Sequence, residues 1–312
     1  MDLKEGVIIK STGSWYKVRL GKDESLDCKF KGKYKIKGIR STNPLAVGDK
    51  VKVRVDDDGV GLISEILDRK NYIIRRSSNL SKETQIIAAN VDIAFLIITI
   101  AYPNTHSGFI DRFLASAEAY RIPVQIIFNK VDLYNEDQTI KKNEWIDIYE
   151  KIGYPCHNIS ALNSDDVMTI ANIIEGKICV FAGNSGVGKS TLVNSIDPSF
   201  KLKTAEISAY HSKGKHTTTF AEMYELDNGG FIIDTPGIKG FGVFDMYKEE
   251  ISHFFIEIFR LSEACQYNNC THTHEPKCAV KSAVESGQIS EQRYFNYIKL
   301  IEDDHEKHRT GY

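Results

Sequence analysis

The chain has 312 residues, of which 42% are hydrophobic, 26% charged and 10% aromatic, and its formal net charge is −2. The length suffices for two or three domains, and the composition is that of an ordinary globular protein rather than a disordered chain. The net charge argues against a uniformly basic nucleic-acid binder, but residues 1–70 carry 16 Lys and Arg against 11 Asp and Glu, which leaves +5 at the N-terminus and −7 in the remainder.

The longest apolar run, residues 93–101, is shorter than the roughly 18 residues of a membrane span and fits a buried strand. The first five residues have no signal-peptide character. We therefore expect a cytoplasmic protein without a membrane partner, whose six cysteines are not paired in disulfides. A monomer is the default expectation.

The N-terminal part reads as five short strands separated by Gly and Asp turns, at residues 6–10, 15–20, 26–33, 50–55 and 61–66. Five short strands in about 65 residues fit a small closed β-barrel of the OB type. We expect this barrel to occupy residues 1–68.

Within the barrel, lysines alternate with other residues from Lys29 to Lys37, so that in an extended strand they would share one face. One interpretation is a solvated edge strand, in which lysine discourages aggregation. The other is a surface for nucleic-acid phosphates, which the fold and the local charge favour.

From about Asn71 the pattern changes to alternating strands and helices. The predicted strands are 91–101, 124–128, 178–182 and 231–233, and the predicted helices are 109–120, 143–152 and 165–175. This alternation predicts a doubly wound α/β sheet over residues 69–245, with its functional loops at the carboxyl ends of the strands. Residues 246–312 read as a mainly helical domain around a cysteine-rich loop.

The segment Asn129-Lys130-Val131-Asp132 follows a predicted buried strand and is typical of a guanine-binding loop. The carboxylate of Asp132 can accept hydrogen bonds from N1–H and the exocyclic amine of guanine, which adenine cannot supply, and such sites discriminate by roughly 10⁴-fold or more. Asn129 would brace the loop and Lys130 would cover the base. Ser160 and Ala161 are predicted to form a second base-contacting loop.

A phosphate loop follows, between a predicted strand and a predicted helix: Gly183-Asn184-Ser185-Gly186-Val187-Gly188-Lys189-Ser190-Thr191. Its glycines let backbone N–H groups turn towards phosphates, and the next helix contributes its positive N-terminal end. Lys189 would reach the β- and γ-phosphates, and Ser190 would bind Mg²⁺. The expected ligands are therefore GTP or GDP with Mg²⁺.

Two later segments complete the predicted site. Asp234 would hold Mg²⁺ through water, and Gly237 can donate a backbone N–H to the γ-phosphate. The next residue, Ile238, cannot orient an attacking water, so slow unaided hydrolysis is expected. The polar run 212–219 contains His216 and three threonines, which are candidates for positioning that water and for closing on Mg²⁺ when the γ-phosphate is present. An ordinary flexible loop is the alternative for this run.

A cluster of three cysteines and one histidine lies within 14 residues: Cys265, Cys270, His272 and Cys278. Four such ligands suit a closed tetrahedral Zn²⁺ site, which can fix a loop that lacks a core. His274 competes with His272 as the fourth ligand, and we favour His272. Four candidate ligands argue for a structural rather than a catalytic metal, and Cys28, Cys156 and Cys179 are expected to be packing residues.

The motif order is unusual, because the base-binding loop precedes the phosphate loop. Together with the barrel, the Lys-His-Thr-Thr-Thr run and the zinc loop, this order resembles the RsgA family of circularly permuted, small-subunit-dependent GTPases, and the resemblance covers essentially the whole chain. It implies a late checkpoint role in maturation of the small ribosomal subunit, whose rRNA would be bound and would stimulate hydrolysis. It also implies a role in hydrolysis for His216 and Mg²⁺ binding by Thr218. Lys215, where the family pattern suggests Arg, and Ile238-Lys239-Gly240 depart from that pattern.

The sequence therefore predicts a GTP hydrolase that acts as a ribosome-dependent switch. An RNA-binding assembly protein with a structural nucleotide is one alternative, against which the intact Lys189, Ser190 and Asp234 weigh. A phosphotransferase acting on a small metabolite is another, although no additional substrate domain or acceptor-side base is evident.

Overall fold

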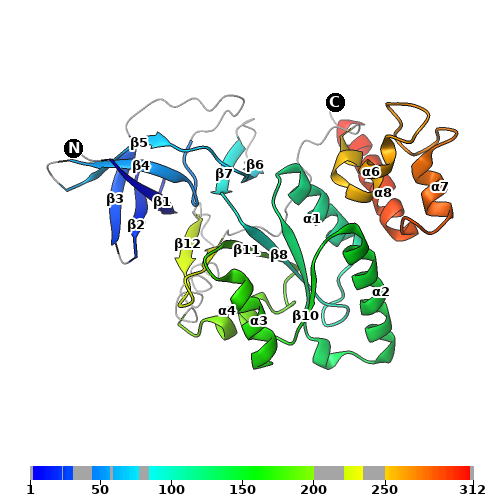
Figure 1. The fold of residues 1–312 in the computed structure, drawn as a ribbon, viewed down its shortest axis with the longest axis horizontal. Helices are drawn as coiled ribbons and strands as arrows, with labels where there is room; N and C mark the ends of the chain where they lie inside the picture. Colours follow the sequence, from blue (N-terminus) through cyan, green and yellow to red (C-terminus); the bar gives the residue numbers. More distant parts are fainter. Residues whose placement is uncertain are drawn as a thin grey trace. The chain divides into compact units, whose positions relative to one another are not determined.

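A computed structural model describes residues 3–22, 24–30, 44–56, 59–76, 84–199, 221–234 and 250–309 (Figure 1). The chain divides into two compact units. The first comprises Met1–Phe95, Ile159–Gly183 and Gly188–Ile238, and the second comprises Leu96–Asn158, Asn184–Val187 and Lys239–Tyr312. The division into these two units rests on contacts between residues in space. It does not test the domain boundaries expected after residues 68 and 245, which stay predictions.

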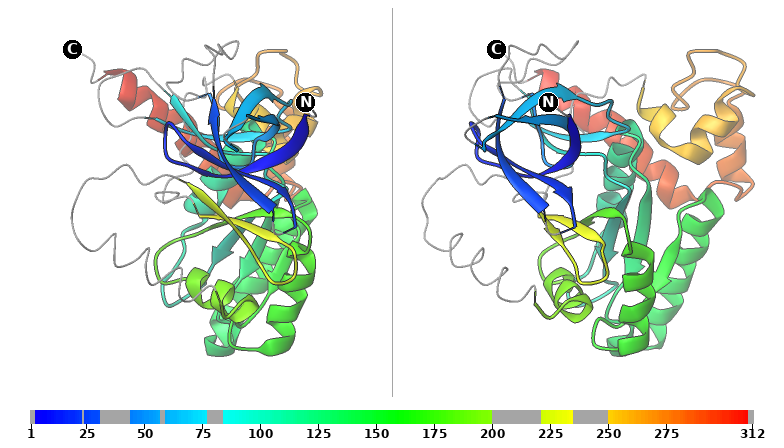
Figure 2. Two further views of the ribbon diagram at one scale, coloured as in Figure 1. Left: turned by 90° about the vertical axis from the view of Figure 1, so that its left-hand side faces the viewer. Right: turned by 60° about the vertical axis from the view of Figure 1, so that its left-hand side comes forward.

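The first unit begins with the predicted five-stranded barrel, formed by β1 (Lys4–Ser11), β2 (Tyr16–Gly21), β3 (Glu24–Phe30), β4 (Lys50–Val55) and β5 (Gly61–Ile66). The strand order is β1-β2-β3-β5-β4, and antiparallel pairing of β1 with β4 closes the barrel (Figure 2). Alternate apolar side chains fill the interior, among them the fully buried Ile8, Val18 and Val51. The OB-type barrel predicted from the sequence is confirmed.

One glycine in the barrel is required by close packing. Gly61 pairs with Cys28 in the parallel β3–β5 ladder, and a Cβ atom at this glycine would lie 2.3 Å from the Cys28 sulfur. Any side chain here would therefore displace the adjacent strand. Cys28 itself is fully buried, and burial raises the pKa of its thiol to about 12, which fits the packing role predicted for it.

A hairpin that the sequence analysis did not anticipate follows the barrel. Its strands, β6 (Tyr72–Arg76) and β7 (Thr84–Ala89), form an antiparallel two-stranded sheet, and Ala88 of β7 also makes an isolated parallel bridge with Val47. Before the hairpin, Arg69 forms a buried ion pair with Asp49, with nitrogen–oxygen distances of 2.5 and 2.6 Å. At the end of β7, the backbone N–H of Ala89 donates to the carbonyl of Val47 at 2.8 Å. The alternation of strands and helices therefore begins after this hairpin rather than at Asn71.

The rest of the first unit is a small α/β layer. The strands β11 (Ile178–Ala182) and β13 (Phe231–Asp234) pair in parallel, and β12 (Glu222–Glu225) pairs with β13 in the antiparallel direction. The helices α3 (Ser164–Ile174) and α4 (Lys189–Ile196) pack against each other. β12 also meets β1 of the barrel, where Lys10 pairs with Glu222, so barrel and α/β layer share one continuous sheet.

The second unit contains the end of β8 (Ile93–Ile98), followed by α1 (Ser107–Ala119), β9 (Val124–Phe128), the short 3-10 helix η1 (Val131–Leu133), α2 (Glu136–Ile152) and β10 (Cys156–Asn158). β9 and β10 are parallel, as predicted for a doubly wound sheet. The start of α2 was predicted at residue 143 but lies seven residues earlier. Asn135 accepts from the backbone N–H of Gln138, whose side chain accepts in return, and this capping box starts the helix before its apolar periodicity begins.

The C-terminal part of the second unit is helical, as predicted. It consists of the 3-10 helix η3 (Ile251–Phe254), α6 (Ile256–Ser262), α7 (Ala279–Glu285) and α8 (Glu291–Arg309). Their buried side chains, including Phe255, Ile258 and Tyr297, form one core with Ala115 of α1, so these helices pack directly on the α/β part. Within the described residues, no helix is both long and apolar enough to cross a membrane.

Candidate functional site

The predicted guanine-binding loop lies at the carboxyl end of β9. The backbone N–H of Asn129 donates to the carbonyl of Ile98 at 2.9 Å, which fixes the start of the loop against β8. The Asn129 side chain is fully buried, and its Nδ2 donates to the carbonyl oxygen of Val187 at 2.8 Å. A residue predicted to bind the base is therefore hydrogen-bonded to the phosphate loop.

Lys130 strengthens the same connection. It adopts a left-handed backbone conformation, with φ of +62°, and its Nζ donates to the carbonyl oxygens of Gly186 at 2.7 Å and Tyr102 at 2.6 Å. The carboxylate of Asp132, in contrast, is exposed and forms no hydrogen bond or ion pair with any described residue. The loop is thus held by Asn129 and Lys130 while the predicted guanine acceptor is left available.

Tyr134 is a site residue that sequence reasoning missed. Its hydroxyl accepts from the backbone N–H of Ile100 at 2.8 Å and donates to the carbonyl oxygen of Asn129 at 2.7 Å. Burial raises the pKa of Tyr134, so the phenol stays protonated and able to donate. A tyrosine two residues after the last motif residue gives no recognised sequence signal, because its role depends on the neighbouring strand.

The phosphate loop runs from the end of β11 to the start of α4. Gly183, Gly186 and Gly188 all have positive φ, with values of 141°, 86° and 99°. A side chain would strain these turns, so glycine is needed for the backbone to curve. Gly188 is the N-cap of α4, and Lys189 begins that helix, with its Nζ donating to the carbonyl of Gly183 at 2.7 Å.

The predicted second base loop is also tied to this helix. The backbone N–H of Ser160 donates to a carboxylate oxygen of Asp166 at 2.7 Å, and the carbonyl of Ala161 accepts from the Ser195 hydroxyl at 2.9 Å. Ser195 lies on α4, the helix that follows the phosphate loop. Leu162, next in the loop, is 81% exposed.

Several predicted site residues lie outside the described residues. These are His216, Thr218 and Gly237, together with most of the lysines of the predicted basic strand; Asp234 is described only as the last backbone position of β13. Of the basic strand only Lys29 is described, and its Nζ lies 4.4 Å from the centre of the Trp15 ring, a cation–π contact on the barrel surface.

The four predicted metal ligands converge in the turn between α6 and α7. One ligand atom from each of Cys265, Cys270, His272 and Cys278 lies within 4.8 Å of every other. The Cys265 and Cys278 sulfurs are 3.8 Å apart, and Nδ1 of His272 lies 3.5 Å and 3.4 Å from them. A tetrahedron with zinc–sulfur bonds of about 2.3 Å and a zinc–nitrogen bond of about 2.0–2.1 Å has edges of about 3.8 and 3.6 Å. The spacing therefore fits a tetrahedral metal site.

Side chains that do not belong to the cluster form hydrogen bonds with the backbone of the turn that carries it. Glu275 accepts from the hydroxyl and the backbone N–H of Thr271 and from the backbone N–H of Thr273. Burial raises the pKa of the Glu275 carboxyl, but these hydrogen bonds, above all the one from the Thr271 hydroxyl, lower it to about 2. The Tyr294 and Tyr297 hydroxyls donate to the carbonyls of His272 and Thr271 at 2.7 and 2.8 Å. His274 is exposed, so His272 is the histidine of the cluster.

Comparisons with known proteins agree with this picture. A family model described as the RsgA GTPase matches residues 66–244, and one described as the RsgA N-terminal domain matches residues 5–63. The protein named small ribosomal subunit biogenesis GTPase RsgA 2 of Bacteroides thetaiotaomicron is 57% identical over 309 residues, which cover 99% of this chain and 100% of the relative. A relative named small ribosomal subunit biogenesis GTPase RsgA, from Flavobacterium psychrophilum, is 51% identical over 98% of this chain and 94% of its own.

Two solved structures are similar over nearly the full length. The crystal structure of YjeQ from Thermotoga maritima matches with a TM-score of 0.79 at 32% identity, covering 97% of this chain and 98% of its own. The structure of YloQ, described as a circularly permuted GTPase, matches with a TM-score of 0.78 at 31% identity, covering 98% and 96%. Because the family model spans more than half of the chain and the relatives match it almost end to end, this chain belongs to the RsgA family of circularly permuted GTPases and is a GTP hydrolase.

Proposed function

We propose that this GTPase acts in the biogenesis of the small ribosomal subunit, that binding to the immature or newly matured subunit stimulates GTP hydrolysis, and that hydrolysis releases the protein. The observation that carries the proposal is the 57% identity, over 99% of this chain, to a protein named for small-subunit biogenesis. Similarity at this level includes the barrel and the helical C-terminal part as well as the nucleotide-binding motifs.

In the proposed nucleotide site, Asp132 recognises guanine and Lys130 covers the base. Asn129 holds the loop that carries both residues in place, through the hydrogen bond from its side-chain amide to the carbonyl of Val187. Ser160 and Ala161 contact the base from the second loop, and the backbone of residues 183–191 surrounds the phosphates. The positive φ values of the loop glycines and the position of Gly188 at the N-cap of α4 support this role.

Ser190, Thr218 and, through water, Asp234 would hold Mg²⁺, which when bound neutralises charge on the β- and γ-phosphates. Lys189 adds a second cation at the same phosphates. The chemistry of these residues fits the ion, because hydroxyl and carboxylate oxygens are the ligands that Mg²⁺ prefers.

Activation is needed because Ile238 follows Gly237 in the sequence. A hydrocarbon side chain cannot orient the attacking water, so unaided hydrolysis is slow, and activators of other GTPases raise the rate by roughly 10³–10⁵-fold. We propose that the small subunit orders the run 212–219 and that His216 and Thr218 then complete the site.

The Cys/His cluster is proposed to bind one structural Zn²⁺. The soft ligand set and the tetrahedral spacing of Cys265, Cys278 and His272 support zinc, and with Cys270 all four positions are taken by protein atoms. Nδ1 of His272 lies 3.5 Å and 3.4 Å from the sulfurs of Cys265 and Cys278, so it is the ring nitrogen proposed to bind the metal. The barrel, with the N-terminal surplus of positive charge, and the helical part are proposed to contact rRNA.

The test measures GTP hydrolysis by the purified protein, alone and with small subunits, at low and moderate salt. Slow basal turnover that rises strongly with small subunits, but not with matched large subunits, is the expected result. The Asp132→Asn variant should in addition prefer xanthosine triphosphate over GTP. Nucleotide binding without stimulation by small subunits would contradict the proposed activator and favour an RNA-binding protein with a structural nucleotide.

A further inference from the structure

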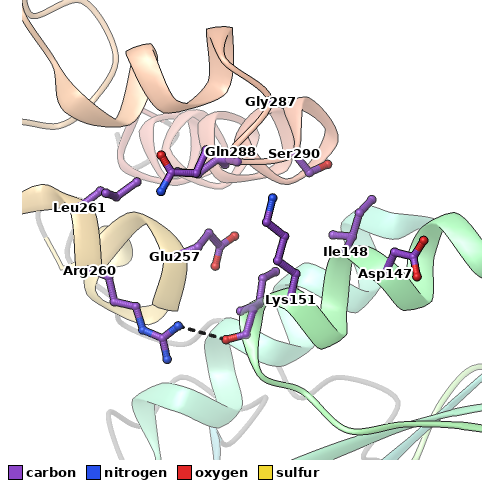
Figure 3. A pocket seen from close by; sticks show the side chains of 11 residues that line it. Asp147, Ile148, Lys151, Glu257, Arg260, Leu261, Gly287, Gln288 and Ser290 are labelled. Carbon is purple, nitrogen blue, oxygen red and sulfur yellow. Dashed lines mark hydrogen bonds between the residues drawn. The ribbon is translucent and has the colours of Figure 1, made fainter.

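The second unit contains a cavity of about 520 Å³ between α2, α6 and the turn 287–290 (Figure 3). Its lining includes two carboxylates and two cations: Asp147, Glu257, Lys151 and Arg260. Because both signs of charge are present, the cavity favours neither an acidic nor a basic occupant and does not identify a ligand. A loop of the same unit, at residues 99–105, has contacts that do point to a function.

The loop 99–105 leads from β8 into α1 and is closed on itself by hydrogen bonds. The backbone N–H of Thr105 donates to the carbonyl of Thr99 at 3.0 Å, and the Thr105 hydroxyl accepts from the backbone N–H of Thr99 at 3.2 Å. Thr99 is fully buried, and its hydroxyl donates to the carbonyl of Pro103 at 2.5 Å. The residues between the two threonines are therefore held in a compact turn.

This loop is joined to the base-binding loop at two points. The backbone N–H of Ile100 donates to the Tyr134 hydroxyl, which in turn donates to the carbonyl of Asn129. Two residues further on, the carbonyl of Tyr102 accepts from Nζ of Lys130 at 2.6 Å. A hydrogen bond from an ammonium group is charge-assisted and therefore stronger than a neutral one. The loop thus fixes both the backbone and the lysine side chain of the base-binding loop.

The same loop borders the phosphate loop. A Cβ atom added to Gly186 would lie 3.4 Å from Cδ of Pro103, so the proline ring lies beside the backbone of this glycine. The carbonyl of Gly186 is also the other acceptor of Lys130, at 2.7 Å. Nζ of Lys130 is therefore held by two main-chain carbonyls, one from the phosphate loop and one from the loop 99–105.

Tyr102 reaches Lys130 through an unusual backbone conformation. Its φ of +59° lies in the left-handed region, which residues with bulky side chains rarely adopt. The Tyr102 side chain is 66% exposed, so burial of the ring does little to offset the cost of this conformation. The hydrogen bonds that close the loop and the one from Lys130 offset it instead. Strained residues that are held in this way are concentrated at sites that bind ligands.

We propose that the main-chain carbonyl of Tyr102 positions Lys130 over the guanine base, and that the left-handed conformation of Tyr102 serves this contact. This role rests on the proposed placement of the base against Lys130. A lysine that is already held at both carbonyls loses little rotamer freedom when the nucleotide binds, so preorganisation favours binding. The loop 99–105 is then a third segment of the nucleotide site, beside the base-binding and phosphate loops.

The experiment compares Tyr102→Asn with Tyr102→Val in the full-length protein. Both variants lose the ring, but asparagine adopts the left-handed conformation far more readily than the β-branched valine. In basal hydrolysis, the KM for GTP should be about tenfold higher for Tyr102→Val than for Tyr102→Asn, and the two variants should differ in KM rather than in kcat. A merely structural role would reduce the folded fraction, which lowers kcat and leaves KM as it was. Phe295→Asn and Phe295→Val, at an exposed aromatic residue of α8, are the matched control pair and should have equal KM values.

A second comparison acts on the loop without changing Tyr102. Thr99→Val removes the hydroxyl that holds the carbonyl of Pro103 and should raise the KM for GTP severalfold. Ser116→Ala removes another buried hydroxyl, which donates at 2.8 Å to a carbonyl four residues away within α1, and should leave the KM unchanged. Urea unfolding of both variants verifies that each is folded under the assay conditions.

Equal KM values for Tyr102→Asn and Tyr102→Val, or equal effects of Thr99→Val and Ser116→Ala, would overturn the positioning role. Asp132→Asn, measured in parallel, separates this result from failure of the proposed nucleotide site. If Asp132→Asn retains its preference for GTP over xanthosine triphosphate, the base does not lie against this loop, and both proposals fail. If the preference changes while the Tyr102 variants behave alike, only the role of Tyr102 is refuted.

Discussion

The side-chain amide of Asn129 donates a 2.8 Å hydrogen bond to the main-chain carbonyl of Val187, which joins two motifs that lie 58 positions apart. Lys130 adds a bond to the neighbouring carbonyl of Gly186. The proposed base-binding loop and the proposed phosphate loop are therefore joined by hydrogen bonds, although circular permutation has reversed their order in the sequence.

Replacing Asn129 with alanine should weaken binding of both GTP and GDP by about tenfold, because the carbonyl of Val187 loses its partner and the loop that surrounds the phosphates loosens. Titration with fluorescent analogues of both nucleotides measures the effect. Asn143→Ala, at an exposed position of α2, is the matched control and should bind as the unaltered protein does. A loss confined to GTP would contradict this explanation, since the affected loop is proposed to contact phosphates common to both nucleotides.

Tyr134→Phe should weaken nucleotide binding, although the Tyr134 side chain is not proposed to contact the nucleotide. Loss of the hydroxyl leaves the N–H of Ile100 and the carbonyl of Asn129 without this partner, at a cost of about 1–3 kcal/mol in stability and with a displaced base-binding loop. Tyr154→Phe removes another buried hydroxyl, which donates to Glu118 at 3.0 Å, and is the control. Both variants should lose stability in urea unfolding, but only Tyr134→Phe should lose affinity for GDP; equal affinities would show that Tyr134 is merely structural.

Removal of the metal should unfold the turn between α6 and α7. The double replacement Cys265→Ser and Cys270→Ser deletes two of four ligands, and structural zinc supplies roughly 10–16 kcal/mol in small zinc domains. Metal analysis should find one zinc per chain in the unaltered protein and none in the variant, with a large loss of near-ultraviolet circular dichroism. Cys156→Ser, outside the cluster, should retain the zinc. A metal-free unaltered protein of normal stability would refute the zinc assignment.

A buried ion-pair network joins α1, α2, α6 and α8 in the second unit. Arg293 donates to Asp111 at 2.8 Å and to Glu257, and Asp111 also accepts from Tyr149 and Asn296. Burial raises the pKa of Asp111, and Arg293 opposes that shift. Asp111→Ala leaves a buried guanidinium short of a partner and should lower the free energy of unfolding by about 3–5 kcal/mol.

The combined variant Asp111→Leu, Glu257→Gln and Arg293→Met distinguishes this explanation from simple loss of packing. It removes all three charges of the network, since Glu257 also pairs with Arg293, and should be less destabilised than Asp111→Ala alone, because no buried charge is left unpaired. Urea midpoints measured side by side give the comparison, with the exposed Asp147→Asn as a control. A combined variant as unstable as the single one would show that shape, and not charge, dominates at this position.

His157 should make stability depend on pH in the weakly acidic range. Half-burial lowers the pKa of His157 below its usual value of about 6.5, while Glu150 opposes the shift. The unfolded chain therefore binds a proton more readily, so the contribution of His157 to stability is complete above about pH 6.5 and is lost as the pH falls through the lower folded-state pKa. His157→Gln should flatten the decline of the urea midpoint between about pH 7.5 and pH 5.5, whereas His253→Gln at an exposed position is the control. A steeper decline in His157→Gln would reverse the inferred sign.

The sequence by itself determined the barrel, the parallel strands, the order of the nucleotide motifs and the four members of the Cys/His cluster. These depend on local patterns: alternation in strands, glycines where the backbone must turn, and ligands spaced along one short loop. The start of α2 and the strands β6, β7 and β12 were missed, because a capping box outweighed hydrophobic periodicity and because short strands are stabilised by their neighbours.

Only the tertiary structure showed that Asn129 supports Val187, that Tyr134 bridges to Ile100, and that Asp111 and Arg293 meet across 182 positions. It also showed the cavity beside Lys151. In each case the partners come from separate elements of the chain. Their proximity depends on how strands and helices pack, and neither residue of a pair carries a local pattern that specifies the other.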